Sequence, residues 1–112
     1  MEIKFEVRKM GKKKPFQLIE VQNPEGKITP SEFVSVVDQI AEKMWSNLSI
    51  VFKLGDKLPD WAIGMLFLQL ETVDRPWVGL CRDEPNHDVV VTNANFQNPK
   101  AGDIIPFAVL GL

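Results

Sequence analysis

The sequence is poor in the residues that build disulfide frameworks, metal clusters and imidazole-based catalytic sites. Among 112 residues it has one cysteine, one histidine and no tyrosine. A single cysteine excludes an internal disulfide and a cysteine metal cluster. Cys81 lies in an apolar, strand-like run, where a buried packing residue and a nucleophile are the two interpretations. His87 is the only histidine that could serve a serine or cysteine nucleophile.

Long apolar runs and an excess of basic charge are also absent. No run approaches the ~20 residues that span a bilayer, and the chain begins with a charged, alternating segment in place of a signal peptide. These features predict a cytoplasmic protein that does not insert into membranes. The net charge of −2 argues against general binding of long nucleic acid through a basic face, while a small anionic ligand remains open.

Familiar nucleotide and hydrolase motifs are missing as well, because the sequence has no Walker loop, no Gly-x-Gly-x-x-Gly and no Gly-x-Ser-x-Gly. Its composition is that of an ordinary globular protein, with 45% hydrophobic and 25% charged residues, which predicts one domain over residues 1–112. So short a chain buries roughly two-thirds of its unfolded surface. Self-association would add to that burial, so we expect a homodimer or a higher homo-oligomer.

The hydrophobic periodicity predicts an α/β fold: a single compact domain with a mixed sheet, two helices and the element order ββαβαβββ. The expected strands lie at 3–7, 16–21, 48–54, 77–80, 88–92 and 103–107, and the expected helices at 30–45 and 59–70.

Two of these elements carry the strongest signals. Thr29 and Glu32 have the spacing of a capping box, and Pro30 occupies the first helical position, which predicts the start of the helix over 30–45. The run 48–54 is almost continuously apolar, as expected of a strand that is buried on both faces. We therefore predict that this strand is central and parallel to a neighbour.

The second predicted helix, over 59–70, has little polar surface, so it should be covered on nearly every side, by the sheet and by a partner subunit. Gly64 lies inside this helix, where glycine costs about 1 kcal/mol relative to alanine. We interpret it as a point of close backbone approach, by another helix or by a ligand.

The turn between strand 48–54 and this helix has features of an anion site. Gly55, Asp56 and Lys57 place backbone N–H groups at the positive end of the helix, and Lys57 adds a positive charge. Asp56 and Asp60 oppose an anion, so the balance of charge is open. Trp61 and Trp77 have two interpretations, as core residues or as platforms that stack adenine bases at about 1–3 kcal/mol each.

The polar loop that begins at Arg82 holds the densest group of chemically capable side chains. Asp83, Glu84 and Asp88 offer oxygens suited to a hard divalent ion, although they match no fixed ligand spacing and acidic residues also form turns. His87 follows Asp83 by four residues and could exchange a proton, coordinate a metal or simply be solvated.

A second charged group surrounds the predicted turn at Gly11. Lysines in such turns keep a sheet edge solvated, or they contact an anion or an RNA backbone. The group consists of Lys9, Lys12, Lys13 and Lys14.

The order of several short signatures matches one protein family. They are Gly55, Pro59 and Trp61 after a buried strand, then Pro76-Trp77-Val78-Gly79, Asp83, Val89-Val90-Val91 and Gly102-Asp103-Ile104-Ile105. Over roughly half the chain this pattern resembles the small ring-nuclease family that accompanies type III CRISPR systems. The resemblance implies a compact α/β fold, a dimer or larger oligomer, and binding of cyclic tetra-adenylate or an RNA 3′ end between subunits, with manganese-assisted cleavage.

The chain departs from the family pattern at one catalytic position. The family places a histidine two residues after the tryptophan of the second helix, and here that position is Ile63, while the loop aspartate is kept as Asp83. Isoleucine neither exchanges a proton nor ligates a metal. The leading hypothesis is therefore a CRISPR-associated accessory protein that recognises cyclic oligoadenylate or an RNA end at a dimer interface, with weak or no nuclease activity.

The residues expected to bind this ligand are Gly55, Asp56, Lys57, Trp61 and Arg82, and those expected to retain any catalysis are Asp83 and His87. Two alternatives stay open. One is a structural or partner-binding oligomeric subunit without a nucleotide ligand. The other is an active, manganese-dependent nuclease that uses Asp83 and His87.

Overall fold

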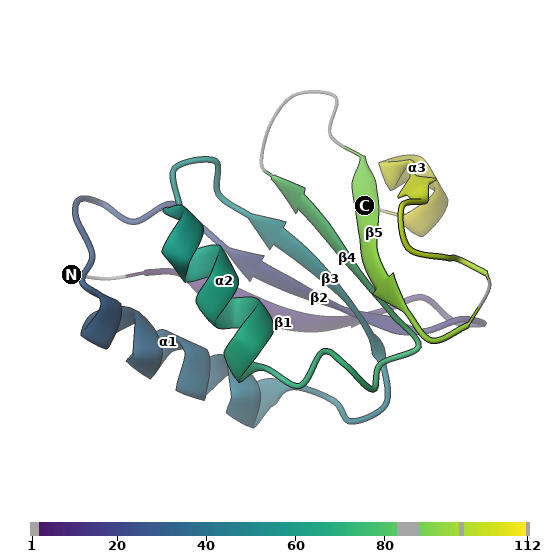
Figure 1. The fold of residues 1–112 in the computed structure, drawn as a ribbon, viewed down its shortest axis with the longest axis horizontal. Coiled ribbons are helices and arrows are strands. Elements are labelled where there is room, and N and C mark those ends of the chain that lie inside the picture. The colour runs from purple at the N-terminus through teal and green to yellow at the C-terminus, as the bar shows by residue number, and fades with distance from the viewer. Residues whose placement is uncertain (1–2, 83–87, 97, 112) are drawn as a thin grey trace.

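The computed structural model describes residues 3–82, 88–96 and 98–111. Six strands form one mixed sheet whose order in space is the order of the chain (Figure 1). The elements are β1 (Phe5–Met10), β2 (Phe16–Val21), α1 (Pro30–Lys43), β3 (Ser49–Leu54), α2 (Asp60–Gln69), β4 (Trp77–Arg82), β5 (Val89–Ala94), β6 (Ile104–Ile105) and α3 (Phe107–Leu110).

The strand pairing confirms the predicted mixed sheet and its central parallel strand. β1 and β2 form an antiparallel pair, β3 is parallel to both β2 and β4, and β4, β5 and β6 continue antiparallel. The helix count differs from the prediction by one. The last predicted strand, 103–107, is shorter than expected and is followed by α3, which begins after Pro106.

The sheet separates two layers of apolar packing. Both parallel connections advance the same way across the sheet, and because such crossovers are right-handed, α1 and α2 cover the same face (Figure 1). The core on this face includes Phe33, Ile40, Phe52 and Leu66. On the opposite face a smaller core is covered in part by α3. Its buried members are Phe16, Leu18, Val51, Cys81 and Val89.

The start of α1 is fixed by the predicted capping box. Thr29 Oγ1 accepts a hydrogen bond from Glu32 N at 3.2 Å, and Glu32 Oε1 accepts one from Thr29 N at 3.2 Å. The helix ends at Lys43, two residues before the predicted end, because the backbone of Trp45 bonds to side chains instead of continuing the helix.

Two buried polar side chains, which we call the carbonyl clamp, hold the segment between α1 and β3. Gln17 is fully buried; its amide accepts from Trp45 N at 3.0 Å and donates to Trp45 O at 2.9 Å. Arg75 is 7% exposed and donates from Nη1 to Trp45 O at 2.6 Å and to Leu48 O at 3.3 Å. Arg75 Nε donates to Glu71 O at 2.7 Å. The clamp thus ties β2 and the segment before β4 to the same backbone carbonyls.

Within the single chain, the apolar helix α2 is covered on one side. Only Ala62 and Leu66 are buried within the helix, and Leu68 is 84% exposed. No described part of this chain makes the expected close approach at Gly64, because a Cβ built there meets no atom within 4 Å. Within the part of the chain that the structure describes, no helix is long and apolar enough to cross a membrane.

Gly64→Ala is expected to raise the free energy of unfolding by about 1 kcal/mol. Alanine loses less backbone entropy than glycine on forming a helix, and the position has room for a methyl group. Urea unfolding followed by circular dichroism measures the change. The reverse substitution at the buried Ala62, Ala62→Gly, serves as the control and should lower stability by at least as much. A loss of stability in Gly64→Ala would contradict the open environment.

Candidate functional site

Three parallel strands bring the predicted binding residues together at the carboxyl-terminal ends of the strands. β2, β3 and β4 all end here, and loops after parallel strands are the usual place for ligand sites in α/β folds. Gly55 follows β3 directly, and its N–H donates to Val21 O at 2.8 Å. We call Gly55, Asp56, Lys57 and Arg82 the strand-end site.

Asn23, which the sequence analysis did not single out, organises the turn of this site. Its Oδ1 accepts from Lys57 N at 2.8 Å, and its Nδ2 donates to Asp56 Oδ1 at 2.8 Å. The only local signal was the Asn-Pro pair after β2, which is typical of a turn. The bond to Asp56 also satisfies one oxygen of a carboxylate that would otherwise oppose an anion.

Arg82, at the end of β4, is joined to the same turn. Its Nη2 donates to Asp56 O at 2.8 Å and to Leu58 O at 3.1 Å. Its Nε is buried and has no acceptor among the described residues. A guanidinium held in this way is a positioned cation: the two carbonyls use both Nη2 hydrogens and Nε is buried, so Nη1 is the group left to donate to a ligand.

The beginning of α2 adds backbone donors beside Arg82. Its first bonds run from Ala62 N and Ile63 N to Pro59 O, at 3.0 and 3.4 Å, and no side chain caps the end. The N–H groups of Asp60 and Trp61 come before these bonds, so they have no intrahelical acceptor. Unsatisfied N–H groups at a helix N-terminus favour an anion there.

The two tryptophans proposed as stacking platforms lie at different places. Trp61 packs edge-on against Phe33, with ring centroids 5.9 Å apart at 87°, and keeps 38% of its surface exposed. Trp77 lies at the start of β4, at the other end of the strand, and contacts Phe16 with centroids 6.2 Å apart. The structure therefore brings only Trp61 near the strand-end site, through the first turn of α2.

The predicted catalytic residues, Asp83 and His87, lie outside the described residues, as does Glu84. Asp88 is described and is exposed. Within residues 3–82, 88–96 and 98–111, no group of three His, Cys, Asp or Glu side chains could hold a metal ion.

Two further positions at which the sequence analysis considered catalytic chemistry, residues 81 and 63, hold side chains that pack in or against the core. Cys81 is 3% exposed and its Sγ lies 3.5 Å from Phe52 O, which agrees with the packing interpretation of this cysteine. Ile63 is half-buried and packs against the core on the helix side of the sheet. The described part of the site therefore combines donors and cations for an anion, and its two carboxylates, Asp56 and Asp60, are exposed. No protein-family model, no curated protein and no solved structure matches this chain.

Proposed function

We propose that the chain is a CRISPR-associated accessory protein of the ring-nuclease kind, which recognises cyclic oligoadenylate or an RNA end at a dimer interface. The observation that carries the proposal is the meeting of Arg82, the Gly55 turn and the α2 N-terminus at the ends of parallel strands. Arg82 and Asp56 are 26 positions apart in the chain, so their contact is a product of the fold.

The donors of the strand-end site suit a phosphodiester. Phosphate oxygens accept from backbone N–H groups and from guanidinium. The N–H groups of Gly55 and Lys57 are bonded within the chain, so the backbone donors for a ligand are those at the start of α2, and the guanidinium is that of Arg82. The exposed Lys57 adds charge, while Asn23 engages the carboxylate of Asp56. Trp61 is exposed enough to contact an adenine base that extends over the first turn of α2.

Recognition is favoured over cleavage because Ile63 takes the position of the family's histidine. An aliphatic side chain packed on a core cannot move a proton to or from a ribose hydroxyl. Hydrolysis would then depend on groups in the loop after Arg82. We expect bound ligand to remain intact for far longer than the time in which it dissociates and rebinds.

Arg82→Lys is expected to weaken the binding of cyclic tetra-adenylate by about tenfold. Lysine keeps the charge but has one nitrogen, so it cannot hold the two carbonyls and also leave a second, fixed nitrogen for the ligand. Binding of radiolabelled ligand, with and without manganese, measures the affinity, and the recovered ligand is checked for cleavage. A linear adenosine tetranucleotide separates ring recognition from RNA-end recognition.

The matched control is Arg8→Lys, at an arginine on β1 that bonds to Glu20 at 2.6 Å. This variant should bind like the unmodified protein. Equal losses in the two variants, or no binding of either oligoadenylate by the unmodified protein, would contradict the proposal.

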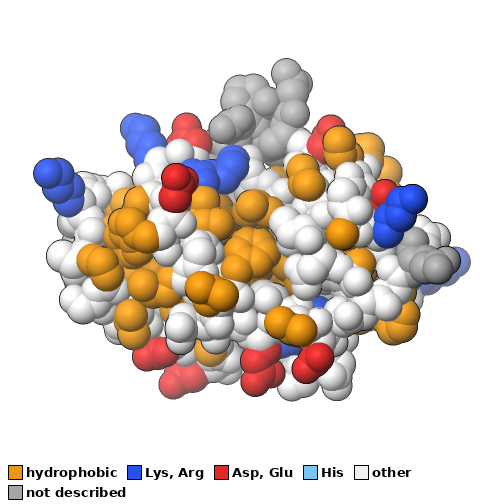
Figure 2. Space-filling view, in the orientation of Figure 1, with side chains coloured by type: hydrophobic (Ala, Val, Ile, Leu, Met, Phe, Trp, Pro, Cys, Tyr) orange, Lys and Arg blue, Asp and Glu red, His pale blue; other side chains and the backbone are white. Residues whose placement is uncertain are grey.

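A second candidate function is a partner-binding or structural subunit, and the exposed apolar surface of the helix layer favours it. Leu68 is 84% exposed and Val73 is 77% exposed. Figure 2 shows hydrophobic side chains gathered on the face that α1 and α2 cover. This candidate predicts an oligomer whose mass and thermal stability do not change when an oligoadenylate is added, which light scattering and thermal unfolding measure.

A further inference from the structure

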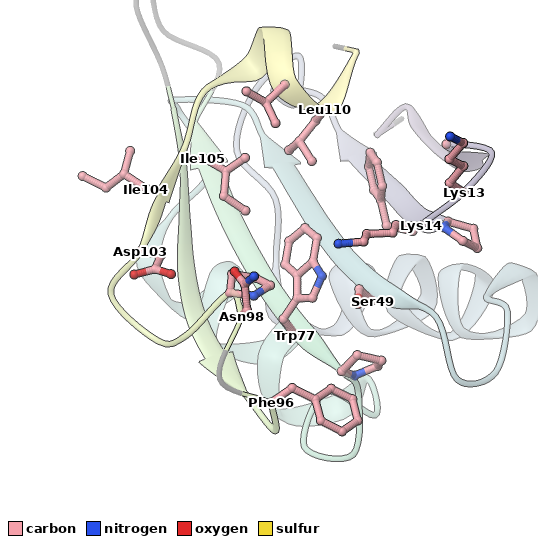
Figure 3. A pocket seen from close by; sticks show the side chains of 16 residues that line it. Lys13, Lys14, Ser49, Trp77, Phe96, Asn98, Asp103, Ile104, Ile105 and Leu110 are labelled. Atoms are coloured by element: carbon pink, nitrogen blue, oxygen red, sulfur yellow. The ribbon is translucent and has the colours of Figure 1, made fainter.

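A pocket lies on the face of the sheet that α1 and α2 leave uncovered. It is at the starts of β3 and β4, the ends that are away from the strand-end site. Its volume is about 890 Å³, within the range of small-molecule sites. Its walls come from the β1–β2 turn, the starts of β3 and β4, and the segment from Phe96 to α3 (Figure 3). We call it the basal pocket.

The interior of the basal pocket is mainly apolar and aromatic. The half-buried Trp77 lies at its centre, with Ile105 and Leu110 on one side and Phe96 on the other (Figure 3). Phe96 is 66% exposed and Val109 is 72% exposed, although both line the pocket. Large apolar side chains that converge on an open cavity favour an apolar occupant, because its binding would remove their surface from water.

The rim of the pocket is positively charged. Lys13 and Lys14 reach it from the β1–β2 turn, which the left-handed Gly11 at φ +80° makes possible. Both lysines are exposed, and no carboxylate pairs with either in the described part of the chain. In Figure 3 the amine of Lys14 points toward Trp77.

One acidic residue, Asp103, also lines the pocket, but it lies away from the two lysines. Asp103 is committed to its own turn, where Oδ2 accepts from Lys100 N at 3.0 Å. In Figure 3 it lies on the far side of the pocket from Lys14, with Trp77 between them. The pocket thus has an aromatic interior with cations on one side only, and charge complementarity selects an anion.

We propose that the basal pocket binds a small aromatic anion, with its ring system against Trp77 and Phe96 and its anionic group at Lys13 and Lys14. Nucleoside monophosphates and aromatic carboxylates share this chemistry. The site is separate from the strand-end site, so the proposal stands or fails independently of the function proposed above.

The test compares two dyes that share an aromatic body and differ in charge. Anilinonaphthalene sulfonate is anionic, and phenylnaphthylamine is neutral. Lys13→Glu combined with Lys14→Glu is expected to weaken binding of the anionic dye by roughly tenfold and to leave the neutral dye nearly unchanged, because the change reverses two charges beside the anionic group. Dye fluorescence measures both affinities.

The control applies the same change of charge to two nearby lysines that do not line the pocket, Lys9 near the end of β1 and Lys12 in the turn. Lys9→Glu combined with Lys12→Glu should change the affinity for the anionic dye by less than about threefold, since solvent and salt screen more distant charges. A variant in which Trp45 and Trp61 are replaced by phenylalanine shows whether the dye is bound in the basal pocket. Trp77 is then the only tryptophan in the sequence, so energy transfer to the dye requires that the dye lie near Trp77.

Displacement by adenosine monophosphate or by naphthoate then identifies which kind of anion the pocket takes. The proposal is overturned if the anionic dye does not bind, if the two charge-reversal pairs weaken it equally, if Trp77 transfers no energy, or if neither competitor displaces it. Circular dichroism of each variant confirms that the fold is kept.

Discussion

Arg75→Met is expected to lower the free energy of unfolding by about 3 kcal/mol, one of the two largest losses that we predict for a single substitution. Arg75 is almost fully buried, and it donates hydrogen bonds to three backbone carbonyls. Methionine fills a similar volume, but it leaves Glu71 O without this donor and Leu48 O with only the longer bond from Gln17 Nε2 at 3.4 Å. A part-buried acceptor that loses its partner costs about 1–3 kcal/mol, and the guanidinium lost from the interior also leaves its packing space imperfectly filled. Urea unfolding of the variant measures the loss.

The carbonyl clamp also predicts coupling between its two members. Gln17→Leu removes the other side chain that donates to Trp45 O and Leu48 O, and these carbonyls lose both donors only when both side chains are replaced. The double variant should therefore be more destabilised than the sum of the two single variants. Arg8→Met, at an exposed arginine, is the control and should change stability by less than about 0.5 kcal/mol. A similarly small effect of Arg75→Met would contradict the clamp.

Gly55→Ala is expected to lower stability by about 2–3 kcal/mol and to weaken oligoadenylate binding together with it. A Cβ at this position would lie 2.1 Å from Asn23 Oδ1 and 2.7 Å from Asn23 N, so both side chain and backbone must move. That movement breaks the bonds from Asn23 to Asp56 and Lys57, which shape the turn. Urea unfolding and the radiolabel binding assay measure the two effects.

The natural control for Gly55→Ala is Gly64→Ala, which makes the same chemical change nine positions later in the chain. It should stabilise the fold and leave ligand affinity unchanged. If Gly55→Ala matched the unmodified protein in stability, the close approach of Asn23 to this glycine would be wrong.

The strands and the two long helices could be predicted because their signals are local. Alternation in β1, the apolar run of β3 and the capping box of α1 each depend on residues close together in the chain. The short helix α3 could not be predicted in this way. Its four residues, all apolar, are too few to show a helical period, and they follow a proline that also suits an edge strand.

The individual residues of the candidate site could be predicted from the sequence, but the hydrogen bonds that join them could not. Gly55 and Lys57 follow a recognisable strand, and Arg82 precedes a polar loop, so each could be proposed from its neighbours. The role of Asn23 depends on a contact across 33 residues, and that of Arg75 on carbonyls 27 and 30 residues away. Such contacts exist only after the sheet has formed, and a polar residue in a sequence gives no sign that it will be buried.

The identity between strand order and chain order has a consequence for how the protein is made. Each strand from β2 to β6 pairs with the strand synthesised just before it, so no strand has to wait for a distant partner. The sheet can grow strand by strand as the chain leaves the ribosome, with β1 at one edge and the most recently made strand at the other. Exposed strand edges are sites of aggregation, and in this topology each nascent edge is covered by the next segment to emerge.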